Sequence, residues 1–291
     1  MLDRKKGGRA MKLGLIDVGG GLRGVYAAGV MDRFLDEGVK VDVGIGISAG
    51  SANVASFLAG QKGRNFPFYT EYSFRREYMS LGNFLKKRSY LDLEYIYGTL
   101  SNRGGENPLD YEALRDNPAE FYIGACEALT GLPRFFTKAD MAQDDYRVFM
   151  ASSAIPFVCH PYAVHGVPCF DGALGDTVPV EMAFRLGCDK VILVLTKPRD
   201  EMRTAKRDEF FANRIRRKYP QAAQRLLGRA ERYNEGVILA KDYEREGKLL
   251  LLAPESVEGV DTLKKDKEAL IRLYRRGVED GGKVRAFLGM E

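Results

Sequence analysis

The chain has 291 residues, of which 45 % are apolar and 29 % are charged, and its net charge is +5. This composition is ordinary for a globular protein with a hydrophobic core, and it excludes wholesale disorder, collagen-like repeats and a small disulfide scaffold. The net charge is too small to indicate nucleic acid as a partner, and none is expected.

The few cysteines and histidines bear on cofactors and compartment. The four cysteines show no CxxC or other short ligand spacing, and there are only two histidines, so we expect no metal and no cofactor. The first apolar run, Leu13–Ile16, ends at Asp17 and is too short for the core of a signal peptide. No segment reaches the about 18 apolar residues of a membrane span. We therefore expect a cytoplasmic protein with reduced thiols, whose membrane contact would be peripheral, at the inner membrane face.

Strands and helices alternate in the first part of the chain. The predicted elements there are a strand over Lys12–Ile16, a tight turn over Gly19–Gly21, a helix over Arg23–Glu37, a strand over Val39–Ile47 and a helix over Ala49–Ala59. This order implies parallel strands joined by right-handed crossovers in an α/β fold. Further on, the sequence predicts a strand over Phe121–Ala128, the end of a helix over Tyr146–Ala151, a hairpin over Tyr162–Phe170 turning at His165–Gly166, a helix over Val180–Leu186 and a strand over Lys190–Leu195.

Two regions differ from this pattern. Residues 66–97 hold ten of the 31 aromatics and also a group of basic residues (Arg75, Arg76, Lys86, Lys87 and Arg88). They fit either a lid or acyl-chain wall that meets phosphate head groups, or the core of a helical cap with a solvated face. Residues 197–235 carry twelve Lys/Arg against six Asp/Glu. The tail that begins there is predicted to contain a helix, a strand over Lys248–Leu252 and a helix over Thr262–Val278.

A run of glycines follows the first predicted strand. Gly19, Gly20, Gly21 and Gly24 fit the pattern G-x-G-x-x-G between a strand and a helix, which is typical of dinucleotide-binding folds. Such a fold requires an acidic residue at the end of the next strand to hold a ribose hydroxyl. Here the nearby acidic residue, Asp42, lies near the start of that strand instead. The loop therefore has three open interpretations: a nucleotide site, an oxyanion hole or a packing contact.

A second glycine motif lies at the end of the next strand. Gly46, Ser48 and Gly50 fit G-x-S-x-G at a predicted strand-to-helix turn, which is where the nucleophile of a serine hydrolase is found. The serine would occupy a strained turn, and a side chain at either glycine would crowd it. The following helix would direct the positive end of its dipole at the anion formed during acyl transfer. The motif in this context predicts a nucleophilic serine.

Ser48 needs a base to take its proton, and three residues are candidates. A Ser–His–Asp triad would use His160 or His165. However, His165 lies in a predicted hairpin turn and His160 precedes a proline, which is more typical of structural histidines. Asp171 ends a predicted strand and precedes Gly172, so it offers a carboxylate base, although Asp-Gly alone is only a turn signal.

In combination, the three motifs resemble the patatin-like phospholipases, a family of lipid acyl hydrolases with a Ser–Asp dyad. The resemblance rests on the glycine loop, on Gly46–Gly50 and on Asp-Gly-Ala at 171–173, in this order and spacing. The stretches 151–156 and 178–183 are also similar to that family. The resemblance covers residues 12–197.

The resemblance implies an architecture. The fold would be a three-layer α/β/α arrangement with a mainly parallel central sheet, plus a small C-terminal appendage of helices and a strand. Residues 12–197 would form the catalytic domain, with an aromatic-rich cap or lid inserted at 66–118. Residues 198–291 would form the appendage.

The resemblance also assigns the site. Ser48 would be the nucleophile and Asp171 the base, while the amides around Gly20, Gly21 and Leu22 would form the oxyanion hole. The remaining motif residues are Gly19, Gly24, Gly46, Gly50, Gly172 and Ala173. Arg23 would help to fix the glycine loop, and a surface position at the start of a helix is the competing interpretation of this residue.

The implied function is a lipid acyl hydrolase of phospholipase A or esterase type that acts on a lipid or ester substrate through an acyl-serine. Three other interpretations stay open at this point. They are an α/β-hydrolase-type esterase with a Ser–His–Asp triad, a nucleotide-binding regulatory protein that uses Gly19–Gly24, and a catalytically silent protein that keeps the fold for interaction.

Overall fold

The computed structural model describes residues 5–6 and 9–290. The strands are β1 (Lys5–Lys6), β2 (Arg9–Ala10), β3 (Leu13–Asp17), β4 (Val43–Ile47), β5 (Glu120–Glu127), β6 (Pro133–Thr137), β7 (Tyr162–Val164), β8 (Val167–Asp171), β9 (Lys190–Val194) and β10 (Leu249–Leu252). The helices are α1 (Val25–Asp36), α2 (Ala49–Leu58), α3 (Phe66–Thr70), α4 (Leu81–Lys87), α5 (Tyr111–Asp116), α6 (Arg147–Ser153), α7 (Val180–Arg185), α8 (Lys206–Ile215), α9 (Pro220–Leu227), α10 (Arg229–Arg245), α11 (Lys267–Gly281) and α12 (Val284–Leu288).

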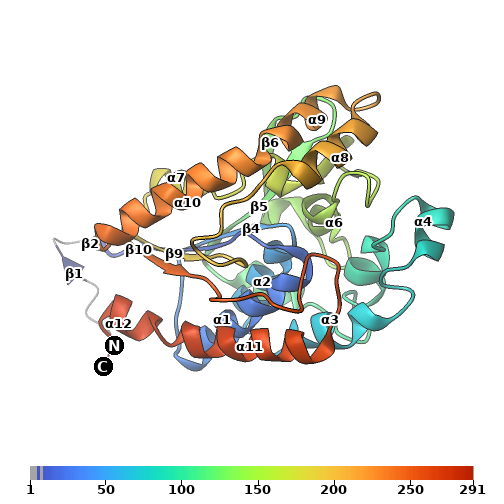
Figure 1. Cartoon of the computed structure of the whole chain (residues 1–291). Coiled ribbons are helices and arrows are strands. Elements are labelled where there is room, and N and C mark those ends of the chain that lie inside the picture. The colour runs from blue at the N-terminus through green and yellow to red at the C-terminus, as the bar shows by residue number, and fades with distance from the viewer. Residues whose placement is uncertain (1–4, 7–8, 291) are drawn as a thin grey trace.

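The described residues form three layers (Figure 1). The middle layer is an eight-stranded sheet, covered by α1, α2 and α11 on one face and by α7 and α10 on the other. The central strands are apolar throughout because both of their faces are buried. For example, Leu13 and Leu15 of β3 pack in the core beside α1, whereas Ile16 belongs to the core beside α7 and α10.

The neighbour order in the sheet is β10-β9-β3-β4-β5-β8-β7, with β6 paired to β5. The five strands from β10 to β5 are parallel, and β6, β7 and β8 are antiparallel to their neighbours. This arrangement confirms the predicted three-layer α/β/α class with a mainly parallel sheet. The predicted hairpin is also confirmed, because β7 and β8 turn at His165–Gly166 with both residues at positive φ.

The structure differs from the predicted elements at several points; for example, β4 begins at Val43 rather than at Val39. The strand β6 was not predicted; it starts at Pro133, which lacks an N–H and is typical of an edge strand. The expected helix end at 146–151 is a complete short helix, α6. The last long helix begins at Lys267 rather than at Thr262, because the Thr262 carbonyl accepts a hydrogen bond from Leu22 and Asp266 caps the helix by accepting from the Ala269 N–H.

The aromatic-rich segment 66–97 is largely core. Its buried aromatics are Phe68, Tyr69, Tyr72, Tyr78 and Tyr97, which fits the helical-cap interpretation. In contrast, Leu81 and Leu85 on the short helix α4 are 74 % and 83 % exposed. The segment therefore combines a packed base with an exposed apolar tip.

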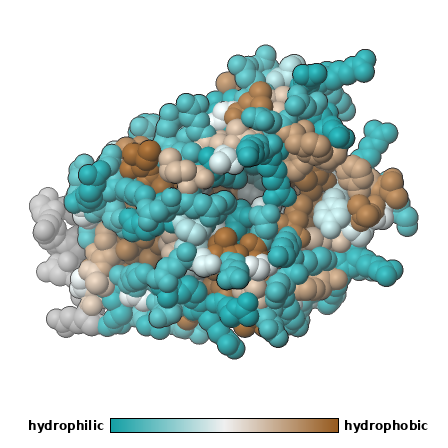
Figure 2. Space-filling view, viewed as in Figure 1, coloured by the Kyte–Doolittle hydropathy of each residue, from teal (hydrophilic) through white to brown (hydrophobic). Residues whose placement is uncertain are grey.

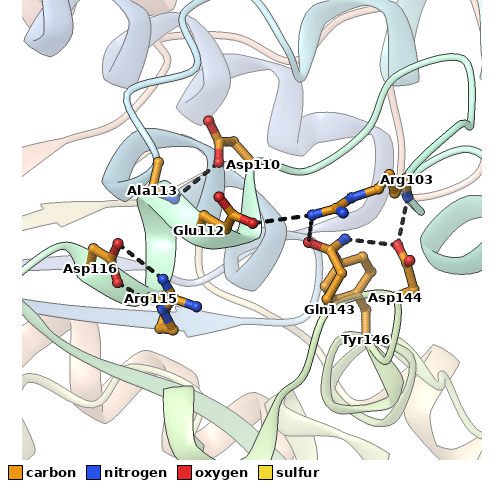
Figure 3. Close-up of polar contacts among 9 residues, drawn as sticks. All are labelled: Arg103, Asp110, Glu112, Ala113, Arg115, Asp116, Gln143, Asp144 and Tyr146. Atoms are coloured by element: carbon orange, nitrogen blue, oxygen red, sulfur yellow. Dashed lines mark hydrogen bonds and ion pairs between the residues drawn. The ribbon is translucent and has the colours of Figure 1, made fainter.

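Polar contacts connect the loop before α5, α5 itself and the loop that precedes α6 (Figure 3). Asp110 caps α5 by accepting from the Ala113 N–H, and Asp144 accepts from the Arg103 N–H at 2.6 Å. The Arg103 guanidinium also donates to Glu112 at 3.2 Å. These groups are exposed and contribute little stability individually, but together they hold the loop that precedes α6.

The C-terminal segment takes part in the same sheet. Its strand β10 pairs in parallel with β9, and its helix α11 packs along α1. The proposed division into residues 12–197 and 198–291 remains a prediction, and the structure adds that this boundary falls between two neighbouring strands of one sheet.

The α1–α11 contact generates a stability prediction. A Cβ added at Gly277 would lie 2.1 Å from the Tyr26 carbonyl oxygen, so Gly277→Ala should force the two helices apart. We expect the free energy of unfolding in urea to fall by about 1–3 kcal/mol. Gly82→Ala on the exposed face of α4 is the control and should cause no loss, because the nearest side-chain atom would be 3.6 Å away. Equal stability of the two variants would contradict this packing.

Candidate active site

Ser48 lies at the turn between β4 and α2 in a strained backbone conformation, with φ 58° and ψ −132°. A Cβ at Gly46 would lie 2.3 Å from the Ser51 Cα, and a Cβ at Gly50 would lie 2.4 Å from the Asp17 carbonyl oxygen. Only glycine fits at both flanking positions, which is the physical reason for the G-x-S-x-G spacing. The N-terminus of α2 follows Ser48 directly.

Asp171 ends β8 and faces this turn. The Ser48 Oγ donates a hydrogen bond to the Asp171 Oδ2 at 2.6 Å, and both side chains are buried. Burial raises the pKa of Asp171, and the hydrogen bonds from Ser48 and from the Ala173 N–H, together with the charges of Arg229 and Arg203, offset part of this rise. The carboxylate is therefore a stronger base here than in water.

The sheet register explains why these two residues meet. β4 pairs with the first part of β5, from Glu120 to Gly124, and β8 pairs with the second part, from Ala125 to Glu127. Because β6 occupies the opposite edge of β5, β4 and β8 follow one another along the same edge. One is parallel to β5 and the other antiparallel, so their carboxyl ends face each other, with Ser48 and Asp171 at the meeting point.

Ser152 of α6 connects the Ser48 turn to β5 by two hydrogen bonds. Its Oγ accepts a hydrogen bond from the Ser48 N–H at 2.9 Å and donates one to the Gly124 carbonyl at 2.6 Å. Nearby, the Asp171 N–H donates to the Ala154 carbonyl at 2.9 Å. The motif glycine Gly172 permits the close approach of β5, since a Cβ there would lie 2.2 Å from the Gly124 carbonyl oxygen.

The glycine loop lies against Ser48. Gly19, Gly20 and Gly21 all have positive φ, at 66°, 143° and 60°. The Gly19 N–H donates to the Asp17 Oδ1 at 2.8 Å, and the Thr196 hydroxyl donates to the Gly19 carbonyl. A Cβ at Gly19 would lie 3.1 Å from the Ser48 Cβ, so the loop directly adjoins the Ser48 side chain.

The three amides expected in the oxyanion hole differ in this structure. Among the described residues, neither the Gly20 N–H nor the Gly21 N–H donates a hydrogen bond to a backbone carbonyl. In contrast, the Leu22 N–H donates to the Thr262 carbonyl at 3.0 Å. Two of the expected amides are therefore available to an oxyanion, and the third is held by the C-terminal segment.

Arg23 is buried, with 5 % of its surface exposed, and this excludes the surface interpretation. Its guanidinium forms an ion pair with Asp261 at 2.5 Å and donates to the Thr262 Oγ1 at 3.1 Å. Burial lowers the pKa of Arg23, and the Asp261 charge opposes that change. Arg23 thus ties the glycine loop to the C-terminal segment.

A buried polar network, which was not predicted from the sequence, supports the glycine loop. The Asp17 Oδ2 accepts from the Asn53 Nδ2 at 2.9 Å, and the Asn53 Oδ1 accepts from the Tyr69 hydroxyl at 3.0 Å. Asn53 also donates to the Gly24 carbonyl at 3.0 Å. Burial raises the pKa of Asp17 to about 6. The sequence feature that could have indicated this network is Asp17, an acidic residue at the end of a buried strand and shortly before the glycines.

Neither histidine takes part in this site. His160 stacks on Tyr162 at 4.5 Å between ring centroids and contacts Ser89 through its Nδ1 at 2.8 Å. His165 is exposed in its turn and contacts Asp140 through its Nε2 at 2.9 Å. The two cavities that Ser48 lines include neither ring, so a Ser–His–Asp triad is not assembled.

Two cavities meet at Ser48. One is narrow, about 60 Å³, and apolar; its lining includes Phe68, Met79, Leu93 and Ile96. The other measures about 400 Å³, is lined by charged side chains and reaches Asp171 and the glycine loop. Figure 2 shows a hollow on the viewed face next to α10, bordered mainly by hydrophilic residues. An ester that spans both cavities would present its carbonyl to Ser48.

Comparisons with known proteins give the following matches. A family model described as patatin-like phospholipase matches residues 18–184, and a model described as a domain of unknown function (DUF6363) matches residues 219–285. The chain is 29 % identical over 192 residues to the uncharacterized protein YjjU of Escherichia coli K12. This match covers 64 % of this chain and 52 % of YjjU. The chain is also 24 % identical over 197 residues to lysophospholipase nte1 of Aspergillus fumigatus. This match covers 66 % of this chain and 12 % of nte1.

The chain thus spans about half the length of YjjU and a much smaller share of nte1. Among solved structures, VipD from Legionella pneumophila aligns with 96 % of this chain and 67 % of its own chain, at a TM-score of 0.49 and 15 % sequence identity.

The patatin-like model matches more than half of the chain. Its range starts at Val18, directly before the glycine loop, and ends at Phe184, beyond the Asp-Gly-Ala motif. It therefore contains all three motifs that the fold gathers around Ser48. This chain belongs to the patatin-like phospholipase family.

Proposed function

We propose that the chain is a lipid acyl hydrolase that cleaves carboxylic esters, with Ser48 as nucleophile and Asp171 as base. The observation that carries the proposal is the 2.6 Å hydrogen bond from the Ser48 Oγ to the Asp171 Oδ2 in a buried site. Membership of the family and the similarity to the lysophospholipase nte1 support the same chemistry. No step requires a histidine.

The proposed reaction has two stages. The Ser48 Oγ attacks the ester carbonyl while Asp171 takes its proton, and this proton then passes to the alcohol that leaves. Water activated by the same carboxylate then cleaves the acyl-serine and releases the acid. The negative charge on the carbonyl oxygen would be stabilised by the Gly20 and Gly21 amides, and one such donor typically contributes about 3–4 kcal/mol to the transition state.

The apolar cavity is the proposed site of the acyl chain. The segment 66–97 supplies eight of its 21 lining residues, including the aromatics Phe68 and Tyr78. The cavity is narrow, so an acyl chain would have to move side chains such as Met79 as it enters. The two interpretations of this segment, an acyl-chain wall and the core of a helical cap, are therefore compatible, because the same buried aromatics would form the wall of the acyl-chain cavity.

We further propose peripheral membrane contact through α4. Figure 2 shows apolar residues gathered on the right-hand side, where Figure 1 places α4. The exposed leucines Leu81 and Leu85 lie beside the exposed Lys86 and Arg88. No helix among the described residues is long and apolar enough to span a membrane. All four cysteines are buried free thiols, which supports the proposed cytoplasmic location, where the contact would be with the inner membrane face.

Replacing the nucleophile tests the reaction. Ser48→Ala should abolish hydrolysis of a lipid ester and also labelling by a fluorophosphonate, because no other group would attack the carbonyl. The midpoint of thermal unfolding should stay within roughly 3 °C, since one hydrogen bond is lost. Labelling of the wild type at another serine, located by peptide mapping, would overturn the assignment.

Replacing the base separates a dyad from a triad. Asp171→Asn should lower kcat/KM for an ester at least about 100-fold, because a neutral amide does not accept the serine proton. The double variant His160→Gln/His165→Gln is the matched control and should keep most of the activity. A folded but inactive double variant would instead support a triad.

Vesicle sedimentation tests the membrane contact. Wild-type protein should sediment with anionic vesicles at low salt and be released at about 0.5 M salt, because each basic residue near the surface contributes about 1 kcal/mol that salt screens. Leu81→Ser/Leu85→Ser should weaken binding, whereas the control Leu129→Ser/Leu132→Ser, at an exposed turn away from α4, should not. Arg76, Lys86 and Arg88 suit charge reversal, since Arg75 and Lys87 already form ion pairs with Glu106 and Asp92. Wild-type protein that stays in the supernatant at low salt would refute the contact.

A further inference from the structure

The polar cavity is built by two parts of the chain. One wall carries the groups of the proposed reaction, including Ser48 and Asp171. A second part of the wall comes from residues beyond 197, including Arg203, Arg229 and Tyr233. The patatin-like model ends at residue 184, so the second wall lies outside the family match.

Most cations of this cavity are neutralised by carboxylates. The ion pairs are Arg23 and Arg207 with Asp261, Arg229 with Asp208, and Lys197 with Glu201. Arg203 is the exception: within the described part of the chain, no carboxylate lies within ion-pair distance of its guanidinium. The cavity is lined by five Lys/Arg and by four carboxylates, Asp171 included, so it keeps an excess of positive charge when Asp171 is ionised. Among these described residues, Arg203 is the cation that forms no ion pair.

The structure holds the Arg203 backbone and side chain in place. Its N–H donates to the Asn234 Oδ1 at 2.8 Å, and its carbonyl accepts from the Asn234 Nδ2 at 3.1 Å. The guanidinium lies 4.9 Å from the centre of the Tyr233 ring, which is a favourable cation–π geometry. Burial lowers the pKa of Arg203 to about 10, so the group is still charged at neutral pH.

The position of Arg203 relates it to the reaction. Arg203 and Arg229 are close enough to Asp171 for their charges to lower its pKa. Arg229 is already paired in a fork with Asp208, through its Nε at 3.0 Å and a second nitrogen. Arg203 thus offers a guanidinium without an ion-pair partner in the polar cavity, which Ser48 also lines, and it does not line the apolar cavity.

We propose that Arg203 binds the phosphate group of the substrate's head, so that the C-terminal segment selects phosphate-bearing esters over neutral ones. This inference rests on the proposed function, because it places the acyl chain in the apolar cavity and the ester carbonyl at Ser48. A guanidinium presents two parallel N–H donors that match two phosphate oxygens. A neutral head would leave the half-buried Arg203 guanidinium without an ion-pair partner.

The test compares two substrates that differ only in the phosphate: 1-palmitoyl lysophosphatidic acid and monopalmitoylglycerol, both in micelles of one neutral detergent. Arg203→Gln should lower the ratio of kcat/KM for the phosphate ester to that for the neutral ester by about 10- to 100-fold, the range of a charge-assisted hydrogen bond. Arg203→Lys, which keeps the charge without the fork, should restore part of the ratio. Arg217→Gln removes an equal charge from an exposed position of the same segment and should leave the ratio unchanged.

Inhibition identifies which part of the head is bound. Inorganic phosphate and glycerol 3-phosphate are tested against hydrolysis of monopalmitoylglycerol, with glycerol as the uncharged control. Inhibition by either phosphate compound that weakens at least about 10-fold in Arg203→Gln supports the site. Equal potency indicates recognition of the phosphate alone, and stronger inhibition by glycerol 3-phosphate indicates recognition of the whole head.

Failure of this inference differs from failure of the proposed function. If the wild type hydrolyses both esters and Arg203→Gln changes their ratio less than about 2-fold, the phosphate site is refuted while the hydrolase stands. If the wild type hydrolyses neither ester, the proposed function fails for these substrates. Calorimetry of glycerol 3-phosphate with the wild type and Arg203→Gln then decides the phosphate site alone: weaker binding by the variant supports it, and equal or absent binding overturns it.

Discussion

The hydrogen bond between Ser48 and Asp171 is the contact on which the rest of the site depends. It exists because β4 and β8 run toward each other along one edge of β5, so that two carboxyl ends meet inside the sheet. The meeting point is buried, and burial raises the pKa of Asp171 and makes its carboxylate a better base. A dyad of this kind needs stable geometry, and the Ser152 hydroxyl supplies it by bridging the Ser48 N–H and the Gly124 carbonyl.

The C-terminal segment completes this site rather than lying apart from it. It adds β10 to the sheet, packs α11 on α1, and reaches the glycine loop through Asp261 and Thr262. The same segment forms the charged wall of the larger cavity. The stretch described only as a domain of unknown function therefore contributes Tyr233 and Asn234, which hold Arg203 beside the proposed reaction centre.

The alternation of strands and helices predicted the α/β class, and the resemblance carried by the three motifs pointed to Ser48 and Asp171. The glycines of these motifs mark places where the backbone comes too close for a side chain. Gly46, Gly50 and Gly172 report such contacts directly. Other parts of the site depend on contacts between distant residues. Ser152 is 104 positions from Ser48, and Asp261 is 238 positions from Arg23. A single sequence gives no sign of these pairings, and for the same reason it did not reveal the Arg203 wall or the engagement of the Leu22 amide.

The central claim is that the Asp171 carboxylate alone activates Ser48, and the pH dependence of fluorophosphonate labelling at Ser48 tests it most directly. A protonated Asp171 cannot accept the serine proton, so the labelling rate should rise with pH as Asp171 ionises. Burial raises this pKa, so the rise should lie above the usual aspartate value of about 4. The account predicts the same profile when both His160 and His165 are replaced by glutamine. A profile that shifts or disappears in that histidine-free protein would contradict it.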